Sequence, residues 1–467
     1  MYKLEFTLKQ HTPIIHFQHD QDGATLRSTE VKPKLDRFLI EIYKDNKHPI
    51  DFKEWLIGKG EKEVLDYKII IEPVINVEHL IEKGSNFGSF FGSMGDEYES
   101  NPKSANIASN NIKCHIFCLK SDLITSISDH LNNFFALNNF GTRQNKGFGC
   151  FTVVDINTIP QNFPLTLFSY HFELDFRKDR IDLDEQKILA EQIDIFYRSL
   201  RSGLNLKGKN GEKFYFKSAL FMYLNSQSIQ WDKKTIKATY FNKDDIQVSE
   251  TYFDRKDNEE KHKKGSPFDI IYLKTQQNFH AHNGITPDIL DSPRVQDDAH
   301  SEKLFRDRLG LSNDEKWFSY RNSLKKTEAK KQGNNWVRKE NNDDPISRYK
   351  SPLLFKIIID EKTKKAKVFF DVFEDIETLS IYESSMFNLL TKPNKTAPSL
   401  NPEVSLFMPI ADRLSFNIKS FLDFAFENIE PTRHIKKTNT LNFQMKIASE
   451  TLNSVYAQLK KYLKHGQ

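Results

Sequence analysis

The 467-residue sequence contains little cysteine, no long apolar run and almost no net charge. Three cysteines (Cys114, Cys118 and Cys150) are too few for a disulfide framework in a chain of this length, and they fit a reducing compartment. No stretch approaches the roughly 18 consecutive apolar residues that indicate a membrane-spanning helix. Residues 1–10 alternate apolar and polar side chains and lack the basic and apolar regions of a signal peptide. We therefore expect a cytoplasmic protein with no membrane partner.

The sequence also lacks a large excess of charge of one sign. It has 68 basic and 64 acidic side chains, and therefore a net charge of +4. This excess is too weak to indicate polyanion binding by itself, so a nucleic-acid site must be argued from where the basic residues lie. The length allows two or three domains, each with a core of its own.

The first 156 residues have an apolar pattern that predicts the order strand, helix, strand, strand, helix, strand. Apolar residues alternate with polar ones from Tyr2 to Leu8, and they recur at helical spacing from Val31 to Ile42. The remaining predicted elements are strands over Tyr67–Glu72, Ile112–Leu119 and Cys150–Ile156, and a helix that begins at Ser121. This βαββαβ order is that of the ferredoxin-like (RRM-like) motif, in which both helices pack on one face of an antiparallel sheet. The other face is then open for binding.

A second, interrupted copy of the motif is predicted after residue 160. Its elements are a strand over Leu167–Phe176, a helix over Asp182–Asn205, a hairpin of Leu353–Ile359 and Ala366–Phe373, and helices over Ala411–Phe426 and Thr451–Leu463. Residues 228–345 are polar and irregular, which indicates an insertion that is either functional or disordered. The sequence thus predicts an α+β protein with two ferredoxin-like domains packed together, residues 1–160 and 161–467.

A glycine-rich loop at residues 139–149, between the second helix and the last strand of the first domain, is the first functional signal. Its glycines allow positive φ and a close approach to a ligand, and their N–H groups could form an anion-binding nest beside two cations. The aromatic residue would either stack on a base or pack inward. The alternative is a turn that only reverses the chain. The candidate residues are Gly141, Arg143, Lys146, Gly147, Phe148 and Gly149.

A cluster of basic residues around the start of the first helix is the second signal. Helix N-termini attract phosphate through unpaired N–H groups and the helix dipole. The alternative is a solvated basic turn. The candidate residues are Arg27, Lys32, Lys34 and Arg37.

The two segments together resemble the RAMP superfamily of CRISPR proteins, whose hallmark is a Gly-rich loop with an Arg or Lys before a terminal Gly-Phe-Gly. Here Lys146 precedes Gly147-Phe148-Gly149. Thr12-Pro13, followed by the basic helix start, is similar to the opening of the large RAMP subunit of the type III-B (Cmr) module. The segment Arg348 to Pro352 is similar to an Arg-x-x-Ser-Pro preface to a strand in the second domain of that subunit.

This resemblance implies a non-catalytic subunit of an antiviral effector complex, which holds crRNA near its 3′ end and engages target RNA. The implied partners are crRNA, target RNA, other RAMP subunits and a polymerase-like large subunit. Phosphate contacts are implied for the basic residues named above and for further ones in the second copy. These are Arg198, Arg201, Lys207, Lys209, Lys217, Arg348 and Lys350.

A metal-independent endoribonuclease that processes CRISPR repeat RNA is the alternative. His11, His16 and His19 lie close together in the sequence, and acid–base cleavage needs a His near the ribose 2′-OH. Against this, cleaving relatives usually carry the Gly-rich loop near the C-terminus. No cofactor or metal is expected, because Cys114 and Cys118 would lie ~13 Å apart on one strand and therefore could not share one zinc ion.

Residues 302–350 hold 13 Lys or Arg and 8 Asp or Glu, with aromatic residues interleaved. Such a mixture suits a single-stranded nucleic-acid surface, through phosphate contacts and base stacking. The alternative is a partly ordered insertion with a small hydrophobic cluster of its own.

Overall fold

The computed structural model describes the chain except for residues 16–24, 45–51, 59–62, 75, 82–103, 179–180, 209–210, 230, 241–301, 313, 318–321, 341, 343–344, 347, 375, 384, 394–405 and 466–467. The chain forms two compact units, which are considered one at a time. Unit 1 comprises residues 1–197 and 353–371, and unit 2 comprises residues 198–352 and 372–467. Among the helices that the structure describes, none has the length and apolar character needed to cross a bilayer.

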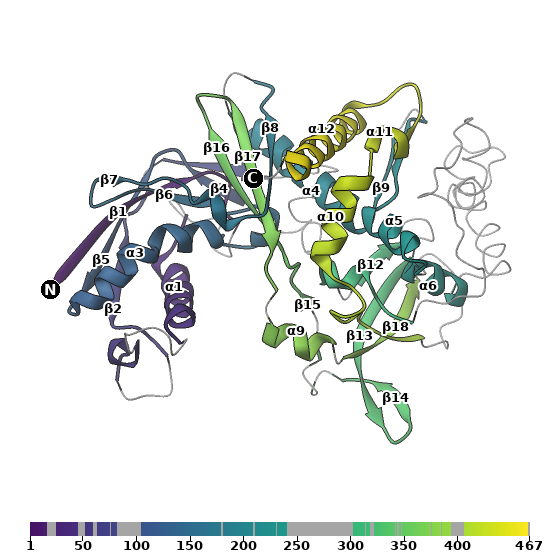
Figure 1. The fold of residues 1–467 in the computed structure, drawn as a ribbon, viewed down its shortest axis with the longest axis horizontal. Helices are drawn as coiled ribbons and strands as arrows, with labels where there is room; N and C mark the ends of the chain where they lie inside the picture. The colour runs from purple at the N-terminus through teal and green to yellow at the C-terminus, as the bar shows by residue number, and fades with distance from the viewer. Residues whose placement is uncertain are drawn as a thin grey trace. The chain divides into compact units, whose positions relative to one another are not determined.

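Unit 1 contains an antiparallel sheet with the strand order β2-β5-β1-β6-β7, whose strands run side by side in Figure 1. In chain order its elements are β1 (Tyr2–Gln10), α1 (Ser28–Tyr43), η1 (Phe52–Trp55), β2 (Tyr67–Ile71), β3 (Val77–Ile81), β4 (Ser104–Ala108), β5 (Ile112–Cys118), α3 (Ser121–Leu137), η2 (Gln144–Lys146), β6 (Phe151–Ile156), β7 (Ile159–Pro160) and η3 (Leu165–Leu167). The β3–β4 hairpin lies between β2 and β5, and the other main elements follow the order βαββαβ. The predicted α+β class is confirmed.

The core of this sheet lies on the face covered by α1 and α3. The alternation in β1 buries Leu4, Phe6 and Leu8 against apolar residues of both helices, such as Leu35 and Phe134. The two cysteines of β5, Cys114 and Cys118, belong to the same core, as expected for structural cysteines, and burial raises the pKa of the Cys114 thiol. The side chains between these inward positions point to the opposite face of the sheet.

A second, three-stranded sheet also belongs to unit 1, and its strand order is β16-β17-β8. It contains β8 (Tyr170–Asp175), β16 (Leu353–Asp360) and β17 (Lys365–Val372), and α4 (Leu183–Arg201) packs on it through Phe196. The boundary predicted at residue 160 therefore lies inside unit 1. The reason is that β16 bonds directly to the first sheet region: the Ile357 N–H donates to Cys150 Sγ and the Ile359 N–H to His11 Nδ1.

Unit 2 contains a sheet with the order β12-β13-β18-β19, in which β14 also pairs with β13, and two smaller sheets, β20-β10-β9 and β11-β15. In chain order its elements are β9 (Leu204–Lys207), β10 (Lys213–Phe216), α5 (Ala219–Ser226), α6 (Asp232–Tyr240), η5 (Arg306–Leu309), β11 (Leu311–Ser312), β12 (Asp314–Trp317), β13 (Asn322–Gln332), β14 (Asn335–Arg338), β15 (Arg348–Tyr349), α9 (Ile376–Glu383), β18 (Met386–Pro393), β19 (Leu406–Pro409), α10 (Ile418–Asn428), α11 (Pro431–His434), β20 (Lys436–Lys437) and α12 (Phe443–His465).

The prediction of an irregular insertion was wrong for the described part of residues 302–345. Strand β13 lies between β12 and β18 in the main sheet of unit 2. Its inward positions include Leu324, Lys326 and Glu328, so two of the three carry charge although all are buried. Buried and exposed positions therefore alternate along β13 as in a half-buried strand, but the buried positions are not consistently apolar.

Candidate nucleic-acid interface

The Gly-rich loop leaves α3 and leads into β6, and its backbone is bonded to neighbouring segments of unit 1. The Gly141 N–H donates to Glu30 Oε1 at 2.6 Å. The Gly147 N–H donates to the Gln144 carbonyl at 3.1 Å, and the Gly149 N–H donates to the Pro13 carbonyl at 2.9 Å. These three N–H groups are therefore engaged inside the protein, contrary to the phosphate-binding nest that the sequence predicted.

Packing explains why two of these positions are glycine. Gly149 has a φ of +64°, and a Cβ atom there would collide with the Phe140 carbonyl. Gly147 has a φ of +79°, and a Cβ atom there would lie 2.5 Å from Ile357 Cδ1 on β16. A larger residue at position 147 would therefore disturb the packing against β16. For this reason, the RNA affinity of a Gly147→Val variant would not show whether the loop backbone contacts RNA.

Phe148 packs inward, which decides between the two alternatives for this residue. Its side chain is only 4% exposed and joins a small cluster with Ile15 and Ala105. The second half of the loop, from Gly147 to Cys150, is buried as a whole. Exposure is confined to the first half, where Arg143 adopts the left-handed conformation with a φ of +57°.

Three of the predicted phosphate-binding lysines brace the loop and helix instead of standing free. Lys34 Nζ donates to the Asn139 carbonyl and to Gln144 Oε1, both at 2.8 Å, and it lies 4.7 Å from the centre of the Phe140 ring. Lys32 pairs with Asp36 at 2.9 Å. Lys146 pairs with Asp194 at 2.9 Å and lies over the Tyr197 ring. Each of the three remains partly exposed, but each has a structural partner.

The start of α1 keeps the features of an anion site. Arg27 occupies the N-cap position, and its guanidinium, which has no acceptor atom, does not cap the helix. The Glu30 N–H donates to the Arg27 carbonyl, so the earlier N–H groups of the first turn are the ones that could face an anion. The bonds of Lys34 to the loop and of Gly141 to Glu30 place the exposed half of the loop beside this first turn. Arg27 and Arg143 thus lie at the same end of α1. Arg37 is exposed on the helix, roughly 15 Å further along.

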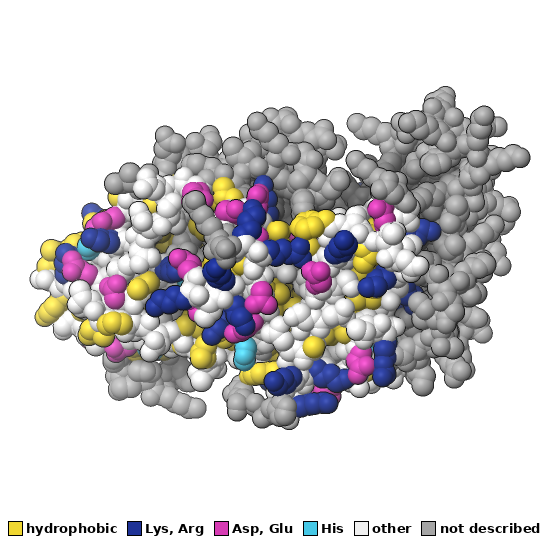
Figure 2. Space-filling view, turned by 90° about the horizontal axis from the view of Figure 1, so that it is seen from above, with side chains coloured by type: hydrophobic (Ala, Val, Ile, Leu, Met, Phe, Trp, Pro, Cys, Tyr) yellow, Lys and Arg dark blue, Asp and Glu magenta, His cyan; other side chains and the backbone are white. Residues whose placement is uncertain are grey.

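The surface charge is mixed. On the face drawn in Figure 2, basic side chains are interspersed with acidic ones and do not form one uniform patch. This agrees with the small net charge of the sequence. Any polyanion contact therefore depends on a few particular cations and not on the overall potential.

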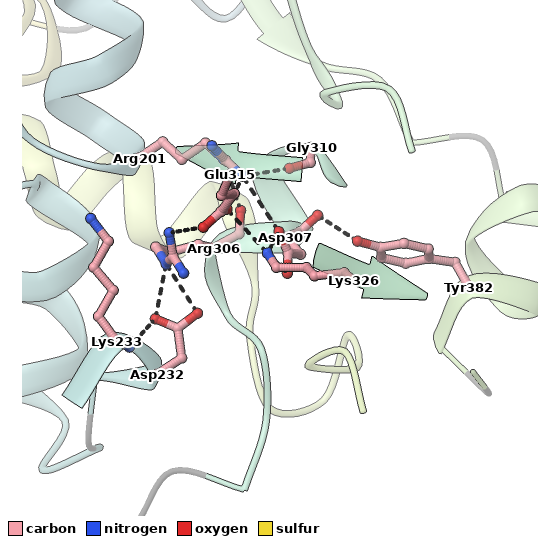
Figure 3. Close-up of polar contacts among 9 residues, drawn as sticks. All are labelled: Arg201, Asp232, Lys233, Arg306, Asp307, Gly310, Glu315, Lys326 and Tyr382. Carbon is pink, nitrogen blue, oxygen red and sulfur yellow. Dashed lines mark hydrogen bonds and ion pairs between the residues drawn. The ribbon is translucent and has the colours of Figure 1, made fainter. Parts of the chain in front are cut away.

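A buried network of charges lies in unit 2 (Figure 3), within the region predicted as a nucleic-acid surface. Arg306 pairs with Asp232 at 3.1 Å and with Glu315 at 3.0 Å. Lys326 pairs with Asp307 at 2.7 Å and also with Glu315 at 3.0 Å. Arg306 is 2% exposed, and Lys326 is about as deeply buried. These cations neutralise carboxylates in the interior and cannot reach a polynucleotide.

The pKa values of the carboxyl groups in this network depend on their burial and on the cations beside them. Burial raises the pKa of the Asp307 carboxyl, although Lys326 opposes this change. Burial alone would also raise the pKa of Glu315, but Arg306, Lys326 and Arg201 together keep it well below its usual value. The Tyr382 hydroxyl donates to the Asp307 carbonyl at 2.7 Å and completes the set.

Arg201, a predicted RNA-binding residue, belongs to this network as well. Its guanidinium donates to the Gly310 carbonyl at 2.8 Å and to Asp307 at 3.4 Å (Figure 3). Tyr349, one of the interleaved aromatic residues, is buried and stacks on Tyr382 at 4.2 Å. The described part of residues 302–350 does not have a hydrophobic cluster of its own, because Leu304, Leu324 and Tyr349 share one core with residues of α9, β18 and β19.

The other predicted RNA-binding residues of the second copy do not belong to this network. Lys350 is exposed after β15, Arg198 is partly exposed on α4, and Lys217 lies 4.5 Å from the centre of the Phe221 ring. Lys207 and Arg348 lie in β9 and β15, but their side chains are outside the described part of the structure. Lys209, His16 and His19 also lie outside the described residues.

Two family models match the sequence. The model of the Cmr1 N-terminal domain matches residues 1–204, and the model of the Cmr1 C-terminal domain matches residues 215–451. The chain belongs to the Cmr1 family. This confirms the resemblance to the RAMP subunits of type III-B CRISPR effectors that the loop and helix motifs indicated.

Two solved structures are similar to this Cmr1-family chain at 11% identity each. The crystal structure of apo Cmr1 from Pyrococcus furiosus matches with a TM-score of 0.30 over 94% of this chain and 98% of the other. A chain of the cryo-EM structure of the type III-B Cmr-beta complex bound to cognate target RNA matches with a TM-score of 0.23 over 34% of this chain and 60% of the other. Comparison with curated protein sequences finds no match. Because both TM-scores are below 0.5, the family assignment rests on the two family models.

Lys356 is a residue of this Cmr1-family chain that the sequence analysis missed. It is fully buried on β16, and its ammonium donates to the Phe135 carbonyl at 2.6 Å and to Asn139 Oδ1 at 3.2 Å. Burial lowers the pKa of Lys356 to about 8. These bonds join the end of α3 and the start of the Gly-rich loop to β16. A lysine inside the apolar run Leu353–Ile359 was the available signal.

His11 does not fit the role of a general acid or base in this Cmr1-family chain. Its Nδ1 accepts the Ile359 N–H at 3.0 Å, and its Nε2 is 2.7 Å from Thr152 Oγ1. Burial is the main reason why the pKa of His11 is lowered to about 3. The ring is therefore neutral near pH 7, and both of its nitrogen atoms are engaged.

We expect His11 to make the protein sensitive to acid. The pKa is about 6.5 in the unfolded chain and about 3 in the folded one, so the unfolded state binds more protons between these values. The contribution of His11 to the free energy of unfolding is complete above pH 6.5 and decreases as the pH falls toward 3. The loss is about 2 kcal/mol at pH 5. Denaturant unfolding at pH 7 and pH 5 measures this loss. A His11→Gln variant should lose less stability between the two pH values, and an equal loss would contradict the assignment.

Proposed function

We propose that this chain is a non-catalytic RNA-binding subunit of a type III-B effector, which holds crRNA near its 3′ end and engages target RNA. The match of both Cmr1 domain models is the observation that carries the proposal. The partners would be crRNA, target RNA, other RAMP subunits and a polymerase-like large subunit.

The start of α1 is the part of the described structure that best suits an RNA phosphate. The first-turn N–H groups and the positive end of the helix dipole lie there, with Arg27 at the N-cap position and Arg143 in the adjoining loop. Arginine binds phosphate oxygens through two parallel hydrogen bonds, which also fixes orientation. Arg37 is exposed roughly 15 Å further along the same helix.

The test is a salt titration of RNA binding by the full chain. Changing Arg27 and Arg143 together to Ala should weaken binding to single-stranded RNA about tenfold at 0.1 M salt. It should also reduce the slope of log K against log salt by about 1.4, because each phosphate contact on a single strand contributes about 0.7. The matched control is Arg433→Ala, which removes an exposed arginine of unit 2 and should change neither quantity. Identical slopes for the double variant and wild type would contradict the proposed site.

The same reactions distinguish the alternative of a repeat-processing endoribonuclease. The buried, neutral ring of His11 offers no proton to a substrate, so the RNA should be recovered at full length in the presence of EDTA. Recovery of discrete shortened products would instead favour the endoribonuclease.

A further inference from the structure

The face of the unit 1 sheet opposite α1 and α3 presents side chains of β1, β2 and β5 to solvent. Ile70 on β2 is 38% exposed, and Lys3 and Glu5 on β1 are each about half exposed. Lys68 and Lys113 are exposed as well, and neither makes an ion pair with another residue of the described structure. On the neighbouring strands β1 and β5, the outward residues Lys3 and Glu5 are thus exposed, whereas His115 and Phe117 are half-buried.

Phe117 is the aromatic residue on this open face, and it lies between two lysines. In the strand register, Phe117 of β5 is opposite Lys3 of β1 and also opposite Lys68 of β2. Adjacent strands are about 4.8 Å apart, so a cation flanks the ring on both sides. Lys3 Nζ lies 5.9 Å from the centre of the ring. We call this cross-strand set, Lys68, Phe117 and Lys3, the open-face row.

His115 and two glutamates lie beside the open-face row. His115 is next along the outward face of β5, and its ring centre is 6.4 Å from that of Phe117. Its Nε2 lies 2.7 Å from Glu72 and its Nδ1 lies 3.5 Å from Glu5. Glu5 also pairs with Lys3 at 2.5 Å, so it is shared between His115 and Lys3. The side of Phe117 toward Lys68 has no such carboxylate among the described residues.

An aromatic ring flanked by cations suits single-stranded nucleic acid better than a protein surface. Every base can stack on an aromatic ring, and the cations can contact the phosphates on either side of the stacked base. In RRM domains, bases stack on aromatic residues of the four-stranded sheet itself. A partner protein that added apolar surface would leave both lysines desolvated without compensation.

We propose that the open-face row is a stacking platform for one base of a single-stranded RNA, in addition to the phosphate site at α1. This inference rests on the proposed function and assigns it a second contact surface. Phe117 supplies the stacking contact and Lys68 contacts one flanking phosphate. Lys3 contacts the other by exchanging its half-exposed partner Glu5 for the phosphate.

The experiment measures the affinity of the full chain for a short single-stranded RNA. Phe117→Ala should weaken binding by about 5- to 100-fold, the range found for loss of one stacked base, and it should leave the salt slope unchanged. Phe117→Leu keeps an apolar side chain and should weaken binding in the same direction. Lys68→Ala should instead lower the salt slope by about 0.7. The matched control is Leu119→Ala, which truncates a 72% exposed residue beyond the end of β5 and should not alter affinity.

Failure of the inference can be told from failure of the proposed function. If wild type does not bind RNA, both are overturned. If wild type binds RNA and responds to the Arg27 and Arg143 changes, but both Phe117 variants match Leu119→Ala, only the stacking platform is overturned. If the Phe117 variants keep full RNA affinity but no longer assemble with other effector subunits, the face is a protein interface. Thermal unfolding of Phe117→Leu ensures that the comparison is made on folded protein.

Discussion

Lys326→Met should lower the free energy of unfolding by about 3–5 kcal/mol, the range for removal of one partner from a buried ion pair. Lys326 is fully buried and donates to both carboxylate oxygens of Asp307 and to Glu315. Methionine matches the length of the side chain, so the main change is the loss of the positive charge. Two carboxylates are then left in the interior of unit 2 with less compensation.

The control for this prediction lies on the same strand. Lys331 of β13 is exposed, and Lys331→Met should change stability by less than about 0.5 kcal/mol. Denaturant unfolding of both variants, with similar m-values, provides the comparison. If the two variants lost the same stability, the charge of Lys326 would not contribute to the fold in the way that its contacts indicate.

Gly149→Ala should destabilise the protein by about 3 kcal/mol or more, because a single methyl group combines backbone strain with a direct collision. The φ of +64° is unfavourable for alanine, and the new Cβ atom would meet the Phe140 carbonyl. The same two residues are bonded, since the Phe140 N–H donates to the Gly149 carbonyl at 3.0 Å. Relief of the collision therefore requires the two ends of the loop to separate.

Gly333→Ala is the matched comparison. Its φ is +62°, but no atom lies within 4 Å of the added Cβ, so only the backbone strain of about 1–2 kcal/mol remains. The difference between the two variants in thermal or denaturant unfolding measures the collision alone. Equal losses for Gly149→Ala and Gly333→Ala would mean that the loop adjusts freely, and that the contact between Phe140 and Gly149 does not hold its two ends together.

Regular alternation of apolar residues made the first part of the fold predictable. The strand at Tyr2–Gln10 and the helices that start at Ser28 and Ser121 follow from periods of 2 and 3.6 residues in the side chains that face the core. The same rule failed for β13, where Lys326 and Glu328 occupy inward positions. Their burial depends on partners such as Asp307 and Ser385, which are distant in sequence, so no local pattern could reveal it.

The position of the Gly-rich turn was predictable from the sequence, but the contacts of its residues were not. The Gly-Phe-Gly motif marks where the chain turns closely past neighbouring segments, and the structure has such a turn there. A close approach to backbone and a close approach to RNA both require glycine, so sequence alone does not distinguish them. Likewise, Lys34 and Arg143 are equivalent in the sequence. Only the structure indicates that the first braces the loop through Gln144, whereas the second lies on its exposed half.

The pair of Asp232 and Arg306 joins two parts of unit 2 that are 74 residues apart in the sequence. Asp232 begins α6 and Arg306 begins η5, so one buried ion pair holds the helix and the turn together. Loss of either charge leaves the other one in the interior without this partner. The position of α6 in the folded chain is therefore tied to a residue far from it in the sequence, and a change at Arg306 acts on α6 as strongly as a change in the helix itself.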